Sequence, residues 1–192
     1  MLTLPMFPLG SVLLPGGALP LHVFEPRYQA LVRDCIEAPD HEFGVVLIDR
    51  GREVGGGEAR RDVGVVARMV QVAQLADDRF AVVAIGTRRI RVIEWLPDDP
   101  YPRAVVEDWP DGAADEPDWE LVADVTRRAQ QFADEESPTE HDGGAFAIAD
   151  LVPLGAADRY AVLCAADAAE RWRVLDQALA DVEAAIEFRL GQ

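Results

Sequence analysis

The chain has 192 residues, of which 49% are hydrophobic and 28% charged, and these totals suit one large globular domain or two small ones. It carries 18 basic and 35 acidic residues, a net charge of −17, and all of the basic residues are arginine. A surface this negative repels phosphate and disfavours nucleic-acid binding. Because the sequence contains no lysine, it excludes a G-x-x-x-x-G-K-[ST] nucleotide loop, a Ser-Lys dyad and a Schiff-base lysine.

The remaining reactive residue types indicate no catalytic or metal centre. Cys35 and Cys164 form no C-x-x-C motif, which favours two buried thiols in a reducing cytosol. The histidines, His22, His41 and His141, lie at no metal-ligand spacing, and neither serine lies in G-x-S-x-G. No apolar run reaches the roughly 20 residues of a membrane span, and the N-terminus lacks the basic region of a signal peptide. We therefore expect a cytoplasmic protein without membrane contact, cofactor or catalytic residues.

The first 110 residues show strand patterns interrupted by one helix pattern. Strands are predicted at 4–7, 18–24, 42–49, 63–75, 80–96 and 101–109. The glycine- and charge-rich segment 50–61 predicts an exposed, mobile hairpin loop, and Gly86, inside a predicted strand, indicates a bulge or bend. A helix is predicted over 26–37, with one apolar stripe: Tyr28, Leu31, Val32, Cys35 and Ile36.

After Pro110 the composition changes from strand-like to helical. A linker at 111–118 is followed by predicted helices at about 118–134, 145–151, 156–165 and 167–190, and the loop 135–144 separates the first two. The last helix starts with an Asp-x-x-Glu capping pattern at Asp167 and carries an apolar seam from Trp172 to Leu190 that suits a helix core or a dimer. The predicted fold is α+β: an antiparallel β pseudo-barrel with one inserted helix, residues 1–112, then an α-helical subdomain, residues 113–192.

Six stretches of the sequence, in this order and spacing, resemble a known family. They are LPMFPL at 4–9, LPG at 14–16, LPLHVFEPRY at 19–28, FGVV at 43–46, VGVVAR at 63–68 and IGTRRI at 85–90, with PY at 100–101 and AVVE at 104–107 closing the barrel. Together they resemble the N-terminal, substrate-binding domain of Lon proteases, and most closely the stand-alone bacterial proteins made of that domain. The resemblance implies a PUA-like pseudo-barrel followed by helices. It also implies recognition of unfolded or damaged proteins, with the ATPase and protease domains lying beyond the chain.

Two arginine-containing stretches and two tryptophans are the candidate binding residues. In the Phe-Glu-Pro-Arg-Tyr stretch, ordinary capping rules favour a strand-to-helix joint, while the bidentate guanidinium of Arg27 suits a peptide or carboxylate contact. Strand alternation places Arg89 and Arg91 on one face, either as a solvated face with carboxylate partners or as a small basic patch. Trp95 and Trp109 are expected to cluster with Trp119 near the end of the barrel, as core or as anchors for an extended peptide.

Three functions remain open from the sequence. The favoured one is a non-catalytic peptide- or protein-binding module, acting as an adaptor or sensor in protein quality control. Its partners would be unfolded or extended polypeptide and a protease or chaperone, and the chain itself a monomer or weak homodimer. The alternatives are an RNA-binding PUA-like module, which the charge opposes, and a small-molecule enzyme with a site near His22, Glu25 and Arg27, which lacks a nucleophile and an oxyanion device. An exposed barrel edge that takes a peptide strand is a further way of binding polypeptide.

Overall fold

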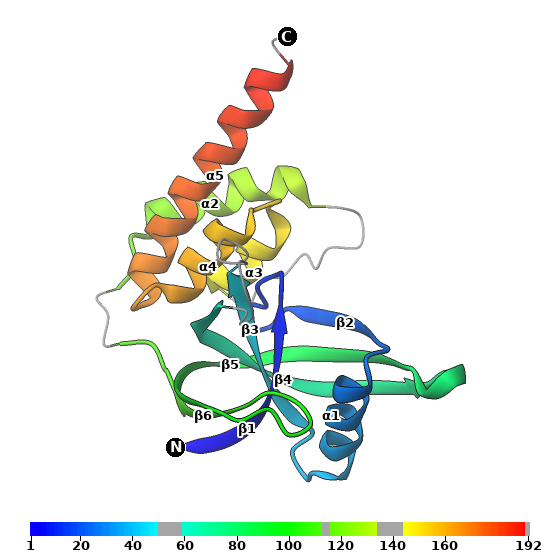
Figure 1. The fold of residues 1–192 in the computed structure, drawn as a ribbon. Coiled ribbons are helices and arrows are strands. Elements are labelled where there is room, and N and C mark those ends of the chain that lie inside the picture. Colours follow the sequence, from blue (N-terminus) through cyan, green and yellow to red (C-terminus); the bar gives the residue numbers. More distant parts are fainter. Residues whose placement is uncertain (50–58, 113–115, 134–143, 191–192) are drawn as a thin grey trace. The chain divides into compact units, whose positions relative to one another are not determined.

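The structure is a computed structural model that describes residues 1–49, 59–112, 116–133 and 144–190 (Figure 1). The chain divides into two compact units, Met1–Pro110 and Asp111–Gln192, which we call the barrel unit and the helical unit. The domain boundary after residue 112 stays a prediction and differs from this division by two residues. In the described part of the chain, no helix is long and apolar enough to cross a membrane. The predicted loop at 50–61 lies largely outside the described residues, as does the loop at 135–144.

The barrel unit is a six-stranded sheet that closes on itself. Its strand order is β2-β5-β4-β3-β1-β6, and β5 also pairs with β6, so that five strands form a ring and β2 continues along the first half of β5. The strands are β1 (Leu2–Leu9), β2 (Ala18–Val23), β3 (Glu42–Asp49), β4 (Ala59–Gln74), β5 (Phe80–Leu96) and β6 (Arg103–Asp108). The α+β class with C-terminal helices is confirmed, but the ring carries bulges and is not a regular barrel.

One pairing differs from the predicted all-antiparallel arrangement. β1 runs parallel to β3, with Met6 opposite Gly44 and Leu9 opposite Leu47. A parallel pair requires a long crossover connection, and here β2 and the helix α1 (Pro26–Glu37) together supply it. The single inserted helix therefore explains why the sheet is mixed.

Helix α1 packs one face onto the barrel. It begins and ends where the sequence predicted, with Pro26 in its first turn, where a missing N–H costs nothing. Tyr28 stacks on Phe7 of β1 with ring centroids 4.0 Å apart, and Leu31 and Val32 are buried beside it. Ile36, the last member of the predicted stripe, stays 43% exposed, whereas the other members are buried.

Gly86 lies at the predicted bulge in β5. The register with β4 shifts between Val66 and Ala67, which leaves Thr87 as the extra residue. The Gly86 N–H donates to the Gly17 carbonyl at 2.9 Å, and its carbonyl accepts from the Gly16 N–H at 2.8 Å. A Cβ at residue 86 would lie 2.3 Å from the Leu14 carbonyl oxygen. Only glycine allows the loop before β2 to approach the strand this closely.

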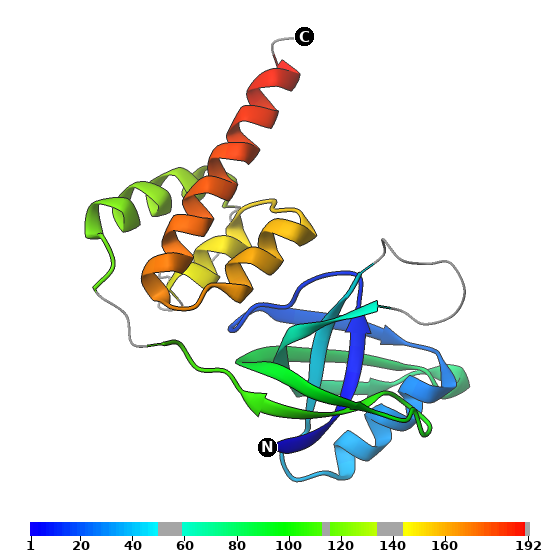
Figure 2. The same cartoon turned by 60° about the vertical axis from the view of Figure 1, so that its left-hand side comes forward.

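The helical unit contains four α-helices in its described part (Figure 2). They are α2 (Trp119–Ala129, continued by the 3-10 turn η3, Gln130–Phe132), α3 (Gly144–Leu151), α4 (Ala156–Cys164) and α5 (Ala168–Leu190). The predicted capping pattern is present, because Asp167 accepts from the Glu170 N–H at 2.8 Å and Glu170 accepts from the Ala166 N–H at 2.6 Å. The buried part of the α5 seam comprises Trp172, Leu175 and Leu179, whereas Leu190 is exposed.

A buried arginine fixes the start of the helical unit. The guanidinium of Arg171 donates to both carboxylate oxygens of Asp111, at 2.6 and 3.1 Å, and lies 4.0 Å above the Phe146 ring. The Gly112 N–H donates to the Ala166 carbonyl at 3.0 Å. Bidentate geometry and the burial of the Arg171 guanidinium make this pair stronger than an ordinary surface ion pair, so it attaches the first residues of the unit to its helices.

Candidate functional site

The part of the sheet beyond the closed ring forms a three-stranded extension. It consists of β2, the first half of β5 (residues 80–85) and the end of β4 (residues 69–74), and we call it the wing. Phe80 and Val82 are buried, and the guanidinium of Arg33 in α1 lies 5.5 Å from the Phe80 ring centroid, so the face that carries these two side chains lies toward α1. Their direct partners on β4 are Gln74 and Val72, whose side chains point to the same face because opposite residues in a sheet share a side.

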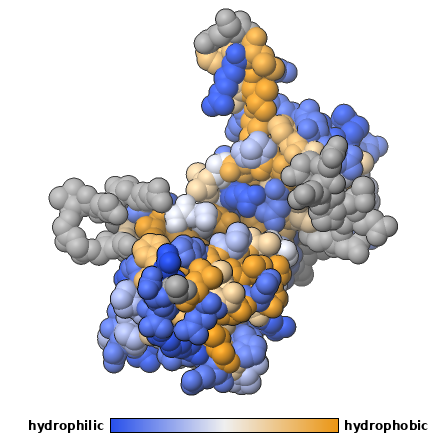
Figure 3. Space-filling view, turned by 90° about the vertical axis from the view of Figure 1, so that its right-hand side faces the viewer, coloured by the Kyte–Doolittle hydropathy of each residue, from blue (hydrophilic) through white to orange (hydrophobic). Residues whose placement is uncertain are grey.

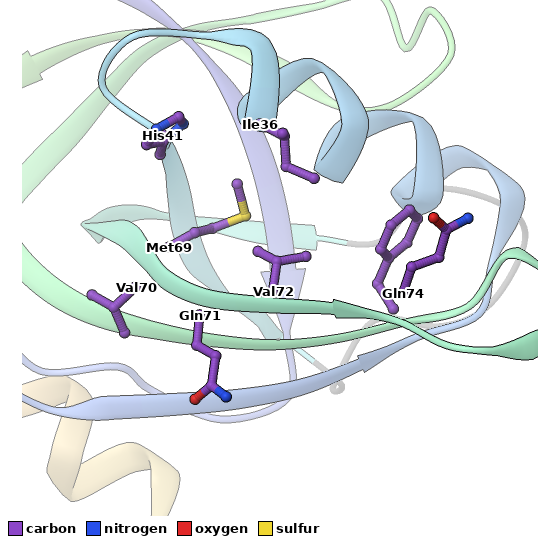
Figure 4. A pocket seen from close by; sticks show the side chains of 8 residues that line it. Ile36, His41, Met69, Val70, Gln71, Val72 and Gln74 are labelled. Carbon is purple, nitrogen blue, oxygen red and sulfur yellow. The ribbon is translucent and has the colours of Figure 1, made fainter.

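An apolar groove of about 380 Å³ lies between the end of α1 and β4 (Figure 4). Ile36 from α1 and Met69 and Val72 from β4 point into the space between helix and strand, and Gln71 points away from it. The lining residues are Ile36, His41, Met69, Val70, Gln71, Val72, Gln74 and Phe80. No charged residue is among them, which is unusual in a chain with a net charge of −17.

Two exposed apolar side chains at this groove indicate a binding surface. Val70 is the extra residue of a bulge in β4, between Met69 and Gln71, and is 59% exposed. It lies with the 43% exposed Ile36 around the same groove. Figure 3 faces the side on which the β4–β5 turn lies in Figure 1, and it shows apolar surface running across the barrel unit. Grouped exposed apolar side chains mark ligand or protein interaction sites more often than single ones do.

A second apolar depression, of about 370 Å³, lies on the face of the wing that carries Ala81 and Val83, which alternate with Phe80 and Val82. It is lined by Pro20, Leu21, His22, Gln71, Ala73, Ala81, Val82 and Val83. None of the large apolar side chains in this lining is as exposed as Val70 and Ile36 are at the groove. We therefore take the groove at α1 as the main candidate site.

The Phe-Glu-Pro-Arg-Tyr stretch is a joint in the structure, and a binding role of Arg27 stays a prediction. Glu25 is the N-cap residue of α1, but its side chain makes no capping hydrogen bond. Instead, its Oε2 accepts from Arg27 Nε at 3.0 Å, and the Arg27 guanidinium lies 4.6 Å above the Tyr28 ring. The nearby His22 ring faces Phe24 at 6.2 Å. These contacts explain each residue by local packing, and an enzymatic site at His22, Glu25 and Arg27 receives no support from them.

Arg89 and Arg91 lie on one face of β5, and both guanidinium groups stack on Trp109, at 4.4 and 4.5 Å from its ring centroid. Arg89 is only 5% exposed, and its carbonyl accepts from the Trp109 N–H at 2.9 Å. Arg88, on the other face, donates to Glu42 at 2.8 Å and to Asp108 at 2.9 Å. Arg88 is thus paired with carboxylates, and Arg89 and Arg91 stack on the Trp109 ring. Their role in binding stays a prediction.

The tryptophans of the barrel unit do not gather in one place. Trp95 lies opposite Ala104 and packs on the buried core, with the Arg60 guanidinium 4.5 Å above its ring. Trp109 follows the other end of the β5–β6 ladder, where Ile90 pairs with Asp108. Five residues of strand, about 17 Å, separate these two ends. The expected cluster of Trp95 with Trp109 is therefore wrong, because strand register rather than distance along the chain places each ring.

Arg128 is the centre of an ion-pair network within the helical unit. Arg128 Nη2 donates to Glu183 at 2.6 Å and Arg128 Nη1 to Asp176 at 2.6 Å. Hydrogen bonds from Arg128 hold the pKa of Glu183 below its usual range. In the described residues, no group of three histidine, cysteine or acidic side chains is placed to hold a metal ion. The network thus serves helix packing and offers no ligand set.

The groove was missed by sequence reasoning, although one signal pointed to it. Residues 70–75 read Val-Gln-Val-Ala-Gln-Leu, six uncharged residues in a chain in which 28% are charged. This segment was predicted only as the end of a strand. Ile36, on the opposite wall, was predicted as core, and nothing in the sequence indicates that the two lie together.

Comparison with known proteins shows that the chain is a member of a family of substrate-binding domains. The chain belongs to the family of the ATP-dependent protease La (LON) substrate-binding domain, whose model matches residues 3–180. Among solved structures, a Lon N-terminal domain protein from Xanthomonas campestris is similar, with a TM-score of 0.70, 32% identity and coverage of 94% of this chain and 98% of that chain. The N-terminal domain of a Lon protease from the Mycobacterium avium complex shares the fold, with a TM-score of 0.70, 20% identity and coverage of 93% and 98%.

A curated relative shows how small a part of a full protease this chain matches. The chain is 38% identical over 106 residues to Lon protease 2 of Myxococcus xanthus, which is 54% of this chain and 13% of that protein. The resemblance stated from the sequence is therefore confirmed for the domain. The activity of the whole protease does not follow from it.

Proposed function

We propose that this chain is a polypeptide-recognition module that binds unfolded or extended segments of other proteins through the groove between α1 and β4. The observation that supports this is an uncharged, partly exposed apolar groove on a strongly acidic chain. Exposed apolar segments distinguish unfolded proteins from folded ones. The negative charge of the chain makes its copies repel one another, so that the apolar groove of one copy does not bind another copy. Membership of the Lon substrate-binding family is consistent with this role.

The module does not cleave what it binds. Its 192 residues contain no lysine and two serines, neither of them in a nucleophile motif, so the chain offers no nucleotide loop and no serine nucleophile arrangement. We propose that it acts in the cytoplasm as an adaptor or sensor of protein quality control, handing polypeptide to a protease or chaperone. Incubation of the purified chain with unfolded casein and ATP should leave both unchanged, and casein fragments or ADP would contradict this.

The binding step has a direct test with a matched control. Fluorescence anisotropy of a labelled, carboxymethylated and therefore permanently unfolded protein measures its affinity for the chain. Val70→Asp places a charge at the groove and should weaken binding at least tenfold, because it desolvates a carboxylate against an apolar ligand. Ile93→Asp is the control, since Ile93 is a bulge residue of β5, 50% exposed, outside the groove. Equal loss in both variants, or in neither, would overturn the groove as the site.

A further inference from the structure

The two edges of the wing differ in how they are protected. Natural proteins blunt an exposed strand edge with proline, charge or brevity, because its unpaired backbone groups form a template for another strand. The β2 edge carries Pro20 at its middle. The β4 edge beyond the bulge has neither proline nor charge from residue 70 to residue 75. Among the strands that the structure describes, none pairs with this edge of β4 beyond Arg68.

Backbone alternation identifies the groups that face the open edge. At the turn between β4 and β5, the Leu75 N–H donates to the Arg79 carbonyl at 2.7 Å. Successive residues of a strand direct their N–H and C=O groups to opposite sides, so Ala73 also faces β5. Val72 and Gln74 therefore direct theirs away from β5, toward the open side. A β-strand placed there would meet two N–H donors and two C=O acceptors, spaced two residues apart as its own hydrogen-bonding groups are.

The open edge of β4 begins where its pairing with β3 ends. β3 pairs with β4 as far as Glu42 opposite Arg68, and the Met69 N–H donates to the His41 carbonyl at 3.0 Å. At His41 the backbone has a φ of 53° and turns away toward α1. An added strand would occupy the place that β3 vacates, and every second side chain would face the groove lined by Ile36 and Phe80.

Carboxylates lie at both ends of this edge. Glu37 and Asp40 are exposed and adjoin the groove residues Ile36 and His41, while Asp77 and Asp78 form the turn at the other end. Two arginines lie nearby and pair with the turn carboxylates: Arg33 with Asp78 at 3.5 Å and Arg79 with Asp77 at 3.8 Å. The charge left over is negative, which favours a strand with basic residues at its ends.

We propose that the groove binds its ligand by strand addition: an extended, proline-free polypeptide segment, apolar at alternate positions and basic at its ends, pairs with the open edge of β4 at Val72 and Gln74. This rests on the proposed function and specifies its chemistry. Main-chain hydrogen bonds supply affinity without regard to side chains, and the apolar groove selects alternate residues. Such a site accepts many unrelated unfolded segments.

The test uses the full chain and a fluorescein-labelled ten-residue peptide of alternating valine and threonine with an arginine at each end. Two further versions carry N-methyl groups, one on the valine amides and one on the threonine amides. In an added strand only one of these two sets faces β4, whichever direction the strand takes. One methylated peptide should bind at least tenfold more weakly than the parent and the other about equally.

The protein side of the test uses Val72→Pro. It removes an N–H that faces the open edge and keeps the hydrogen bonds to β5, so the fold should tolerate it. Val72→Ala is the matched control, because it keeps the N–H and shortens the side chain. We expect a loss of at least tenfold in affinity for Val72→Pro beyond that of Val72→Ala. Should Val72→Pro not fold, amide hydrogen exchange of the unaltered chain decides: bound peptide should slow exchange at Val72 and Gln74 and leave Ala73 unchanged.

Each outcome separates the two proposals. If the peptide binds, but neither methylated set, nor Val72→Pro, nor amide protection shows a difference, strand addition is overturned while polypeptide binding stands. If neither the peptide nor the unfolded protein binds, both proposals fail. If the chain without peptide sediments as a dimer and Val72→Pro makes it monomeric, the edge pairs with a second copy, and strand addition by a foreign segment is overturned.

Discussion

Gly86→Ala should destabilise the barrel unit more than any ordinary surface change. The new methyl group would lie 2.3 Å from the Leu14 carbonyl oxygen, which belongs to the backbone and has little freedom to shift. Relief of this overlap separates the strand from the loop and breaks the two hydrogen bonds between Gly86 and residues 16 and 17, at 2.8 and 2.9 Å. Two such bonds contribute about 1 kcal/mol each and the steric strain about 1–3 kcal/mol. The expected loss is about 3–5 kcal/mol in the free energy of unfolding, a large part of a typical total of 5–15 kcal/mol.

Hydrogen exchange in increasing urea, read by mass spectrometry, measures this loss where it occurs. Peptides from β3 and β4 report the barrel unit, and peptides from α5 report the helical unit in the same sample. Gly44→Ala is the comparison, because its methyl group would meet the flexible Met6 side chain, at 2.4 Å from Sδ, and we expect a loss of about 1–3 kcal/mol. A loss below about 1 kcal/mol for Gly86→Ala, or a loss no larger than that of Gly44→Ala, would refute the close-approach reasoning.

Three further predictions concern buried and paired groups. Burial raises the pKa of the Cys35 thiol to about 12, so this thiol should resist a thiol reagent at pH 8 until urea unfolds the chain. The buried thiol contributes its full stability below about pH 8.5, the pKa of a thiol in the unfolded chain, and this contribution should be lost as the pH rises toward 12. Because Arg128 lowers the pKa of Glu183, the helical unit should lose stability as the pH falls below about 4.3, and Arg128→Met should show a weaker acid dependence in circular dichroism melts. Arg171→Leu should cost about 1–3 kcal/mol, because it removes two charge-assisted hydrogen bonds to the Asp111 carboxylate, which is 42% exposed and can be rehydrated; an unchanged melting temperature of the helical unit would contradict this.

The elements of the fold were accessible from local sequence, and their partners were not. The period of apolar residues placed α1 at its observed bounds, and glycine in a strand placed the bulge at Gly86. Both features depend on a few neighbouring residues. The parallel pairing of β1 with β3 was mispredicted, because strand partners are set by the whole sheet rather than by either segment.

The candidate site shows the same limit more clearly. Its two walls, Ile36 and the segment from Met69 to Gln74, lie more than 30 residues apart and meet only when α1 packs against the wing. Arg88 likewise finds Glu42, which lies 46 residues earlier in the chain. The lack of charge in residues 70–75 was the one local signal. It indicates a binding site only once the structure shows that one edge of this strand is open.

The position of β1 also governs the order in which the barrel unit can form. β1 lies between β3 and β6, and its residue Leu2 pairs with Val106, 104 residues later. Pairings between such distant residues lose chain entropy before they gain contacts, and they fold slowly. During synthesis β1 leaves the ribosome long before its partner β6, and its edge toward β6 stays open until residue 108 has emerged. A newly made copy therefore exposes β1 as an unpaired segment for a time. We propose that the folded chain binds segments of this kind.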